Sequence, residues 1–439
     1  MVSIRPKLSG IGVAAALLGS LLLVSPAPVA ASGVAFPSVS ANPPAVAAGQ
    51  AVAGVFPCQQ PAHAYHCYAP KQIQAAYGFN TLYHMGVLGQ LRTIVIVDAF
   101  DDPYIVSDLA TFDSTFGLPA PQAFNIIYPD GDGGYNPGWA SEISLDVEWA
   151  HAIAPAATID LVLALSNSDE DLNSATKYAV DNNLGDVISQ SFGEAECPAA
   201  SSDVSALHSI YQEATGKGIT LLASSGDEGA AQINCSGTDY MRSASWPADD
   251  PLVTGVGGTS LTANLTTGAY GSERAWADNY SGGCFPANKY GCSGGGFSTV
   301  YPRPAYQPGV SGQGNHRGVP DVAYDGGVDG GVLACFDGTW YDFGGTSAGS
   351  PQWAGLVALT DSINHGRVGF INPALYQIAA SPYLYASMFH DITSGNNNWP
   401  KIGSSSAITG YNTKVGWDAV TGLGTPKANV LVPFLAMNL

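Results

Sequence analysis

The residue best suited to chemistry is a serine in the glycine-rich segment GGTSAGSPQWAG, which spans residues 344–355. Ser347 precedes a stretch of helical character, with Pro351 near the first turn. Such a turn presents a hydroxyl at a helix N-terminus, where backbone N–H groups favour developing negative charge. A serine in a loop of this kind is often only a helix cap. Ser347 is nevertheless a candidate nucleophile.

Two acidic residues offer a base for such a hydroxyl. Glu142 and Asp146 are four residues apart, a spacing that places both carboxyl groups on one face of a helix. Carboxyl groups in one site cannot both ionise freely, so their pKa values separate and a proton is shared. The alternative is a solvated acidic helix face. Leu145, Val147 and Trp149 make this stretch unusually apolar for a solvated face.

Two further aspartates follow runs that are typical of strands. Asp227 lies in SSGDEGA, directly after the run ITLLA, and Asp98 lies near the end of TIVIVDAF. Functional groups of open α/β sheets gather at the carboxyl ends of strands. Asp227 is therefore a candidate site residue, although taken alone it would be a turn aspartate. Asp98 is equally consistent with a site residue and with an N-cap or turn.

These residues need elements that hold them along one edge of a sheet. Short apolar, β-branched runs predict buried parallel strands, and helical stretches alternate with them. The alternation predicts an α/β fold: a largely parallel central sheet, helices on both faces and a single catalytic domain. After Pro247 the chain is rich in Gly, Ser and Asn, and we expect long loops. The predicted strands are 93–100, 125–129, 158–165, 186–192 and 219–225, and the predicted helices are 71–79, 104–117, 141–155, 171–182 and 206–216.

The charge balance is strongly acidic. The 439 residues include 15 Lys and Arg against 35 Asp and Glu, a formal net charge of −20. A hydrophobic content of 46% with 11% charged residues excludes intrinsic disorder. Without a basic surplus to neutralise phosphates, we expect no nucleic-acid partner. Few carboxylates can have basic partners, so little stability is lost at low pH, which indicates an acidic working environment.

The N-terminus has the character of a secretory signal. Arg5 and Lys7 precede the apolar run 11–24, and small residues lead to Ala31. The run is shorter than the ~20 residues that span a bilayer, so a cleaved signal peptide over residues 1–31 fits better than a membrane anchor. We expect secretion, no membrane association after cleavage, and a flexible lead-in over residues 32–67.

Seven cysteines also fit an exported protein. Metal binding through cysteine is disfavoured, because the sequence contains no CxxC or Cys/His cluster. Many connectivities are open. The short spacing favours the pairs Cys58–Cys67 and Cys284–Cys292, after which Cys197 and Cys235 could pair and leave Cys335 free.

In combination, the order Glu142, Asp146, Asp227 and Ser347 resembles the sedolisin family, the serine-carboxyl peptidases of the subtilisin-like clan. The related subtilisin branch uses a histidine base in an HGT-type motif, but no histidine before Ser347 is followed by glycine. The resemblance covers residues 68–439, the expected peptidase domain, and implies a subtilisin-like fold. Other strings that carry it are YAPKQIQAAYGF, SWPADDPLVTGVGGTS, CSGGGFSTVYPRPAYQ and RGVPDVAYD.

The resemblance implies an endopeptidase that hydrolyses peptide bonds of proteins at acidic pH. Ser347 would be the nucleophile, Glu142 the general base and later acid, and Asp146 the group that polarises Glu142. Asp227, with the backbone N–H of Ser347, would form the oxyanion hole, and Asp98 an outer hydrogen-bond network. A glutamate, with a usual pKa of about 4.3, still accepts protons where a histidine, at about 6.5, is already charged.

The resemblance also implies where an extended peptide substrate would bind. Gln190 precedes three residues at a strand end that resembles the substrate-lining edge of the family. Backbone hydrogen bonds would hold the peptide there. The implied substrate-binding residues are Ser191, Phe192 and Gly193.

A late segment, residues 391–418, resembles the calcium site of the family. Asp391 and Asp418 would supply carboxylate oxygens, and Ile392, Lys414 and Gly416 backbone carbonyls, for one Ca²⁺ ion. The family usually has glycine in place of Lys414, whose charge could weaken binding. The alternative is a Gly/Asn-rich loop without metal.

Only about 36 residues separate the predicted signal cleavage from Tyr68. That length is too short for the folded prosegment that sedolisins generally carry. We expect a monomer with protein or peptide substrates. Two alternatives remain: a subtilisin-like neutral peptidase, and a non-catalytic secreted binding protein on the same fold.

Overall fold

The structure is a computed structural model. It describes residues 36–37, 48, 51, 54–196, 201–236, 238–277, 291–310, 315–400 and 406–439, with 36–37 and 201 described for the backbone alone. Residues Ser32–Leu439 form one compact unit. Within the described ranges, no helix is both long enough and apolar enough to cross a membrane.

The core of the fold is a sheet of eight strands among the described residues. Its strands are β3 (Thr93–Ala99), β4 (Ala123–Ile127), β5 (Thr158–Ala164), β6 (Val187–Gln190), β8 (Thr220–Ser224), β12 (Thr254–Ala263), β13 (Tyr270–Ala275) and β16 (Val322–Asp325). They follow the order β13-β12-β8-β6-β3-β5-β4, and β16 pairs with β12. Only the β12–β13 pairing is antiparallel, so the predicted largely parallel sheet is confirmed.

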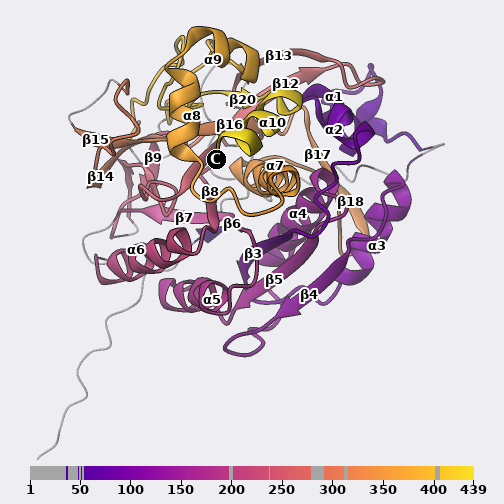
Figure 1. Ribbon diagram of the computed structural model, residues 1–439, viewed down its shortest axis with the longest axis horizontal. Helices are drawn as coiled ribbons and strands as arrows, with labels where there is room; N and C mark the ends of the chain where they lie inside the picture. The colour runs from indigo at the N-terminus through magenta and orange to yellow at the C-terminus, as the bar shows by residue number, and fades with distance from the viewer. Residues whose placement is uncertain are drawn as a thin grey trace, which may run out of the picture. The chain divides into compact units, whose positions relative to one another are not determined.

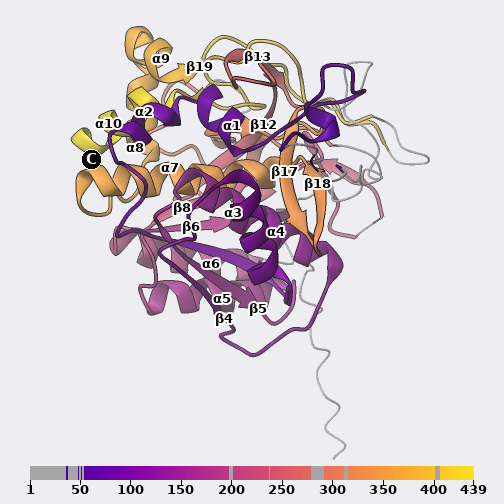
Figure 2. The same ribbon diagram turned by 90° about the vertical axis from the view of Figure 1, so that its right-hand side faces the viewer.

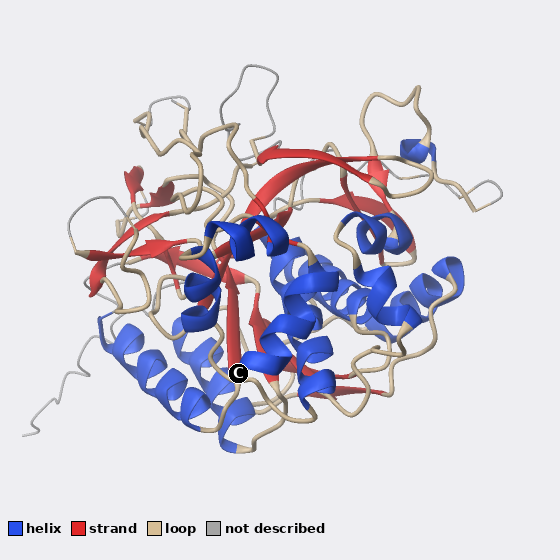
Figure 3. Cartoon of the chain, turned by 45° about the horizontal axis from the view of Figure 1, so that its top comes forward, coloured by secondary structure: helices blue, strands red, loops and turns tan. Residues whose placement is uncertain are grey.

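Helices cover both faces of this sheet (Figures 1 and 2). The helices of the described residues are α1 (Pro70–Ala76), α2 (Phe79–His84), α3 (Ile105–Phe116), α4 (Pro137–Ile153), α5 (Asp169–Asp181), α6 (Ser201–Gly216), α7 (Gly349–Asn364), α8 (Asn372–Ala379), α9 (Pro382–Met388) and α10 (Ala428–Asn438). α4 and α7 pack on one face, whereas α5 and α6 pack on the other. In Figure 3, red strands in the middle of the view lie between blue helices, whereas others lie among tan loops.

The alternation of side chains along β3 explains the two layers. Ile94 and Ile96 belong to the core shared with α4 and α7, whereas Val95 and Val97 belong to the core shared with α5 and α6. Successive side chains of a strand point to opposite faces, so a strand buried on both sides is apolar throughout. The predicted α/β fold with helices on both faces is confirmed.

Small strands and turns surround the central sheet. β7 separates β1 from β11, and β17 lies between β18 and β2 in a second small sheet. These and the remaining short elements are β1 (Phe36–Pro37), β2 (Cys67–Tyr68), β7 (Phe192–Ala195), β9 (Ala231–Ile233), β10 (Tyr240–Arg242), β11 (Ser245–Trp246), β14 (Gly296–Pro302), β15 (His316–Val319), β17 (Gly331–Phe336), β18 (Thr339–Phe343), β19 (Phe389–His390), β20 (Thr425–Pro426), η1 (Pro57–Gln59) and η3 (Thr346–Ala348).

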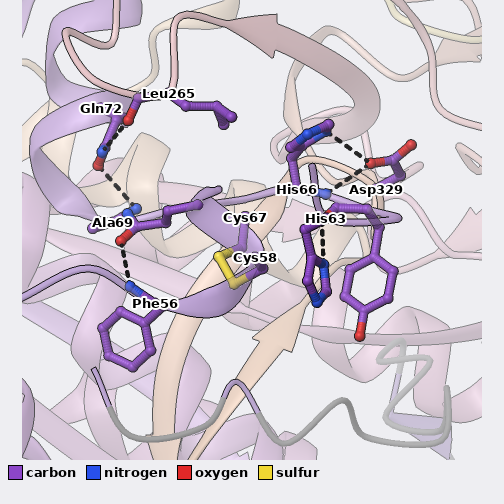
Figure 4. Close-up of a disulfide and its surroundings, with 11 residues drawn as sticks. Phe56, Cys58, His63, His66, Cys67, Ala69, Gln72, Leu265 and Asp329 are labelled. Carbon is purple, nitrogen blue, oxygen red and sulfur yellow. Dashed lines mark hydrogen bonds and ion pairs between the residues drawn. A yellow bond between two sulfur atoms is a disulfide. The ribbon is translucent and has the colours of Figure 1, made fainter. Parts of the chain in front are cut away.

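A disulfide closes the loop that enters the body of the protein. Cys58 and Cys67 are bonded, as predicted from their spacing (Figure 4). Cys67 opens β2, which pairs with β17 and so joins this loop to the rest of the fold. Gln72, at the start of α1, accepts a hydrogen bond from the backbone N–H of Ala69 and donates one to the carbonyl of Leu265.

The other cysteines agree with the prediction as far as they are described. Cys335 is free and buried. Cys235 and Cys292 are both disulfide-bonded. Their predicted partners, Cys197 and Cys284, lie outside the described residues, so those two pairings stay predictions.

Candidate active site

Helix α4 positions Glu142 and Asp146. It begins at Pro137, about one turn before the predicted range 141–155, because the side chain of Asn136 accepts hydrogen bonds from the free N–H groups of its first turn. Proline is tolerated there, since its missing N–H would have no helical partner. The capped start anchors the helix that carries both carboxyl groups.

The carboxyl groups of α4 are withdrawn from water. Every residue from Trp139 to Ile153 is buried, and Glu142 and Asp146 are each 0% exposed. A helix enclosed on all sides belongs to the interior of a protein. The alternative of a solvated acidic face is therefore wrong.

Asp98 completes a cluster of three carboxyl groups. It lies inside β3, beside Leu163 of β5, and not in a turn. Burial raises the pKa of Asp98 to about 8. Burial also raises the pKa of Glu142 and of Asp146 well above their usual values, and the neighbouring carboxyl charges add to the rise. The cluster therefore retains protons that exposed carboxyl groups would lose.

Ser347 lies in the short turn η3, which leads directly into α7. Gly345, just before the turn, has a φ of 101°, in the region that favours glycine. The turn packs against α4 and β8, and Ser347 is 0% exposed. The fold thus places Ser347 beside α4, the helix of Glu142 and Asp146.

The hydroxyl of Ser347 lies beside Glu142. It opposes the rise in the pKa of Glu142, because a hydroxyl that points to a carboxylate stabilises the charged form. The two groups do not meet at the distance and angles of an ordinary hydrogen bond. Catalytic hydrogen bonds are often long until substrate binds. The arrangement is suited to proton transfer from the serine to the glutamate.

Asp227 lies in the loop after β8, at the predicted carboxyl end of a strand. Its Oδ1 accepts hydrogen bonds from the backbone N–H and the hydroxyl of Thr346, both at 2.8 Å. The charge of Asp227 also raises the pKa of Glu142. Asp227 is therefore attached to the turn of Ser347 and acts on the same carboxyl cluster.

The predicted strand 186–192 is interrupted at Ser191. β6 ends at Gln190, and β7 begins at Phe192. The hydroxyl of Ser191 lies near Asp146 and lowers the pKa of that carboxyl group, although the two groups do not meet at the geometry of an ordinary hydrogen bond. The side chain of Ser191 therefore serves the carboxyl cluster.

Phe192 and Gly193 lie at the start of β7. The ring of Phe192 packs against Trp139 of α4, with 6.3 Å between the ring centroids. The backbone of β1 runs antiparallel to this strand, with Phe36 opposite Gly193 and Pro37 opposite Phe192. This edge of β7 accommodates an extended segment.

The predicted calcium ligands lie close to one another. The carboxylate of Asp391 accepts hydrogen bonds from the N–H of Gly416 at 3.1 and 3.2 Å, and that of Asp418 accepts one from the N–H of Lys414 at 3.1 Å. Both acidic residues lie near the hydroxyl of Tyr385. The last member of the predicted set is Ile392, which follows Asp391.

The donor set at this position is made of hard oxygens, which calcium prefers. Burial raises the pKa of Asp418 to about 6, against several backbone N–H donors that lower it. In the described part of the chain, no group of three or more His, Cys, Asp or Glu side chains is arranged to hold a metal. A cation here would depend on backbone carbonyls as well as on the two carboxylates.

Two residues near the site, Thr346 and Glu228, have no role that the sequence alone reveals. Thr346 lies inside the quoted string GGTSAGSPQWAG, yet only the folded chain shows that it binds Asp227. Glu228 follows Asp227, and burial and that neighbour raise its pKa to about 7. In the sequence, the only indication of their importance is that Thr346 precedes Ser347 and Glu228 follows Asp227.

Comparison with known proteins identifies a family and individual proteins that this chain resembles. The chain matches the Subtilase family over residues 139–374. Kumamolisin of Bacillus sp. (strain MN-32) is 32% identical over 387 residues, which cover 85% of this chain and 64% of kumamolisin. Sedolisin of Pseudomonas sp. (strain 101) is 31% identical over 343 residues, which cover 76% of this chain and 56% of sedolisin. The chain thus spans 56–64% of the length of these two relatives.

A solved structure shares the fold. It is titled "Pseudomonas sedolisin (serine-carboxyl proteinase) complexed with two molecules of pseudo-iodotyrostatin", and it matches with a TM-score of 0.73 and 28% identity. The match covers 86% of this chain and 100% of that chain. The subtilisin-like fold is therefore confirmed, and so is the resemblance on which it was predicted. The chain belongs to the sedolisin family, within the subtilases.

Proposed function

We propose that this chain is a secreted serine-carboxyl endopeptidase that hydrolyses peptide bonds of proteins at acidic pH. One observation carries the proposal: the buried hydroxyl of Ser347 lies beside a buried cluster of carboxyl groups and affects the pKa of Glu142. Glu142 is the base, Asp146 and Asp98 share protons with it, and Asp227 belongs to the oxyanion hole.

The reaction needs two proton transfers by Glu142. Its carboxylate takes the proton of the Ser347 hydroxyl as the serine oxygen attacks the peptide carbonyl carbon, and it later gives that proton to the leaving amine. The acid proton of Asp227 and the backbone N–H of Ser347 stabilise the negative oxygen of the intermediate. Water then attacks the acyl carbon and gives a proton to Glu142, which passes it to the oxygen of Ser347 as the ester bond breaks and the acid product leaves.

The histidines support a carboxylate base over an imidazole base. His151 is on α4, but its ring contacts the carbonyl of Pro119 at 2.8 Å and Asp113 at 3.1 Å. His208 pairs with Asp250 at 2.7 Å. No interaction between a histidine and Ser347 is found among the described residues. This arrangement disfavours the alternative of a subtilisin-like neutral peptidase.

The edge of β7 is the proposed binding site of the substrate backbone. An extended peptide that adds to a strand gains main-chain hydrogen bonds without regard to its sequence. The antiparallel pairing of β1 with Phe192 and Gly193 supports this use of the edge. We propose protein or peptide substrates, no nucleic-acid or membrane partner, and a secreted monomer.

The segment 391–418 is the proposed site of one calcium ion. The two carboxylates and the backbone carbonyls of Ile392, Lys414 and Gly416 would hold it, and its charge would offset the repulsion between Asp391 and Asp418. We expect a chelator to lower the melting temperature at pH 6 by several degrees. Asp418→Asn would abolish this response, whereas Asp239→Asn, in another loop, would keep it. No change with chelator would count against the site.

Digestion of a protein substrate between pH 2 and pH 8 tests the activity. We expect cleavage to peak below pH 5 and to disappear in Ser347→Ala. Ser350→Ala is the matched control, because Ser350 is a buried serine of α7 that pairs with Ser189 at 2.8 Å. A peak at pH 7–8 would favour a neutral peptidase, and no cleavage at any pH would favour a binding protein.

A further inference from the structure

Thr346 makes three hydrogen bonds that determine how Asp227 is presented. Its backbone N–H and its hydroxyl both donate to Oδ1 of Asp227, at 2.8 Å each. The hydroxyl oxygen in turn accepts the N–H of Gly226 at 3.1 Å. Thr346 is 0% exposed and Asp227 is 8% exposed, so water competes little for these bonds.

The direction of these bonds leaves little freedom. A threonine hydroxyl has a single proton, and since its oxygen accepts the N–H of Gly226, that proton points to Asp227. Oδ1 then accepts two hydrogen bonds, which occupy both of its lone pairs. An acid proton on Asp227 therefore belongs on the other oxygen, Oδ2.

We propose that Thr346 is a positioning residue, which keeps the acid proton of Asp227 on Oδ2 and directs that O–H toward the oxyanion. This inference rests on the proposed function. The same bonds attach Asp227 to the backbone of residue 346, and the next N–H along the chain, that of Ser347, is the other proposed oxyanion donor. Both donors thus move as one unit, which is the preorganisation that stabilises a transition state.

Removal of the hydroxyl provides the first test. Thr346→Val keeps the branched shape but loses one of the two donors to Oδ1. Loss of a whole oxyanion donor typically costs ~10²–10³ in kcat. Because the backbone donor remains, we expect a smaller loss, of about 10–100-fold in kcat, with little change in KM. Thr346→Ser keeps the hydroxyl, and we expect it to retain most of the activity.

The pH profile separates positioning from simple stability. The hydroxyl of Thr346 stabilises the charged form of Asp227, so its removal favours the acid form. The titratable groups on which Asp227 acts are Glu142 of α4 and the adjacent Glu228. In Thr346→Val we therefore expect the alkaline limb of kcat to move to higher pH while its maximum falls. A merely structural role would lower the maximum without moving the limb.

A double-mutant cycle completes the test. In an Asp227→Ala background the hydroxyl has no acid to orient, so we expect Thr346→Val to add less than a twofold loss. Kinetics are measured per active site titrated with a covalent serine reagent, and Thr346→Ala replaces the valine variant if that does not fold. An inactive wild type overturns the proposed function. If the wild type is active but Thr346→Val leaves kcat and the alkaline limb unchanged, this inference alone is overturned. Additive losses in the double-mutant cycle would overturn it as well.

Discussion

Helix α4 holds two buried glutamates with different neighbours. Glu142 lies beside Ser347 and the carboxyl groups of Asp98 and Asp146. Glu148, further along the helix, accepts a hydrogen bond at 2.9 Å from the backbone N–H of Cys335 in β17. Both side chains are 0% exposed, and burial raises the pKa of both well above the usual value.

The difference shows that burial and a raised pKa do not identify a catalytic base. Glu148 meets a backbone donor and the nearby Asp108, which itself accepts the N–H of Gly338 at 3.1 Å. Nothing described beside Glu148 is a hydroxyl nucleophile. Glu142 has both a hydroxyl and carboxyl partners, and this combination of neighbours supports proton transfer.

The largest expected effect comes from replacing each of the two glutamates by glutamine. We expect Glu142→Gln to lower kcat by ~10²–10⁴, because general acid–base catalysis typically contributes that much. We expect Glu148→Gln to keep kcat within about threefold, because the amide oxygen can still accept the N–H of Cys335. Steady-state kinetics at pH 4 on a peptide substrate measure both effects. Equal losses in the two variants would break the comparison.

The carboxyl cluster also predicts how stability varies with pH. A carboxyl group whose pKa is raised by folding binds more protons in the folded state than in the unfolded chain between the two pKa values. Its contribution is complete below the unfolded pKa, near 4, and is lost as pH rises through the folded pKa. With Asp98 at about 8, we expect the free energy of unfolding to fall between pH 4 and pH 8.

Asparagine substitutions test whether the carboxyl cluster causes this fall in the free energy of unfolding with pH. Asp98→Asn removes a group that is fully buried beside α4 and whose folded pKa is about 8. Asp108→Asn, near Glu148, removes a group that backbone donors from Asp337 and Gly338 partly stabilise as a carboxylate. Between pH 4 and pH 8, the melting temperature should change less with pH in Asp98→Asn than in Asp108→Asn. An equal or larger flattening in Asp108→Asn would show that the cluster is not the main source.

Five of the eight strands of the central sheet could be predicted, because their patterns are local. The run 93–100 became β3, since its apolar side chains serve cores on both faces. The break at Ser191 could not be predicted, because nothing in DVISQSF distinguishes one strand from two. The strands from β9 to β18 were missed for a related reason: many of their segments are rich in Gly and Ser and show no period. They include β12, β13 and β16 of the central sheet.

The candidate site was predicted residue by residue, but not as an arrangement. Motif strings pointed to Ser347 and Asp227, whereas spacing alone could not show that Thr346 connects them. Contacts between residues more than 100 positions apart depend on how the sheet brings its loops together. The burial of Glu142 depends equally on packing by α7 and η3, which no local pattern reports.

The smallest effect is expected for two buried serines, Ser144 on α4 and Ser191 in the break between β6 and β7. Ser191 lowers the pKa of Asp146 within the carboxyl cluster, whereas Ser144 donates to Asp102 at 3.2 Å and lowers the pKa of that group. Ser191→Ala would raise the pKa of Asp146, so the cluster would release protons at higher pH. We expect the acid limb of kcat to move to higher pH.

The amplitude of this change follows from the loss of one polar neighbour, which we compare with a hydrogen bond that forms when substrate binds. A contribution of about 1 kcal/mol corresponds to a loss of about twofold to tenfold in kcat at pH 4. Ser144→Ala acts on Asp102, which is not among the groups that set the pKa of Glu142 or Asp146. It would leave the acid limb in place. If both alanine variants moved the limb equally, proton transfer would depend on the general acidity around α4, and the distinction between its two glutamates would fail.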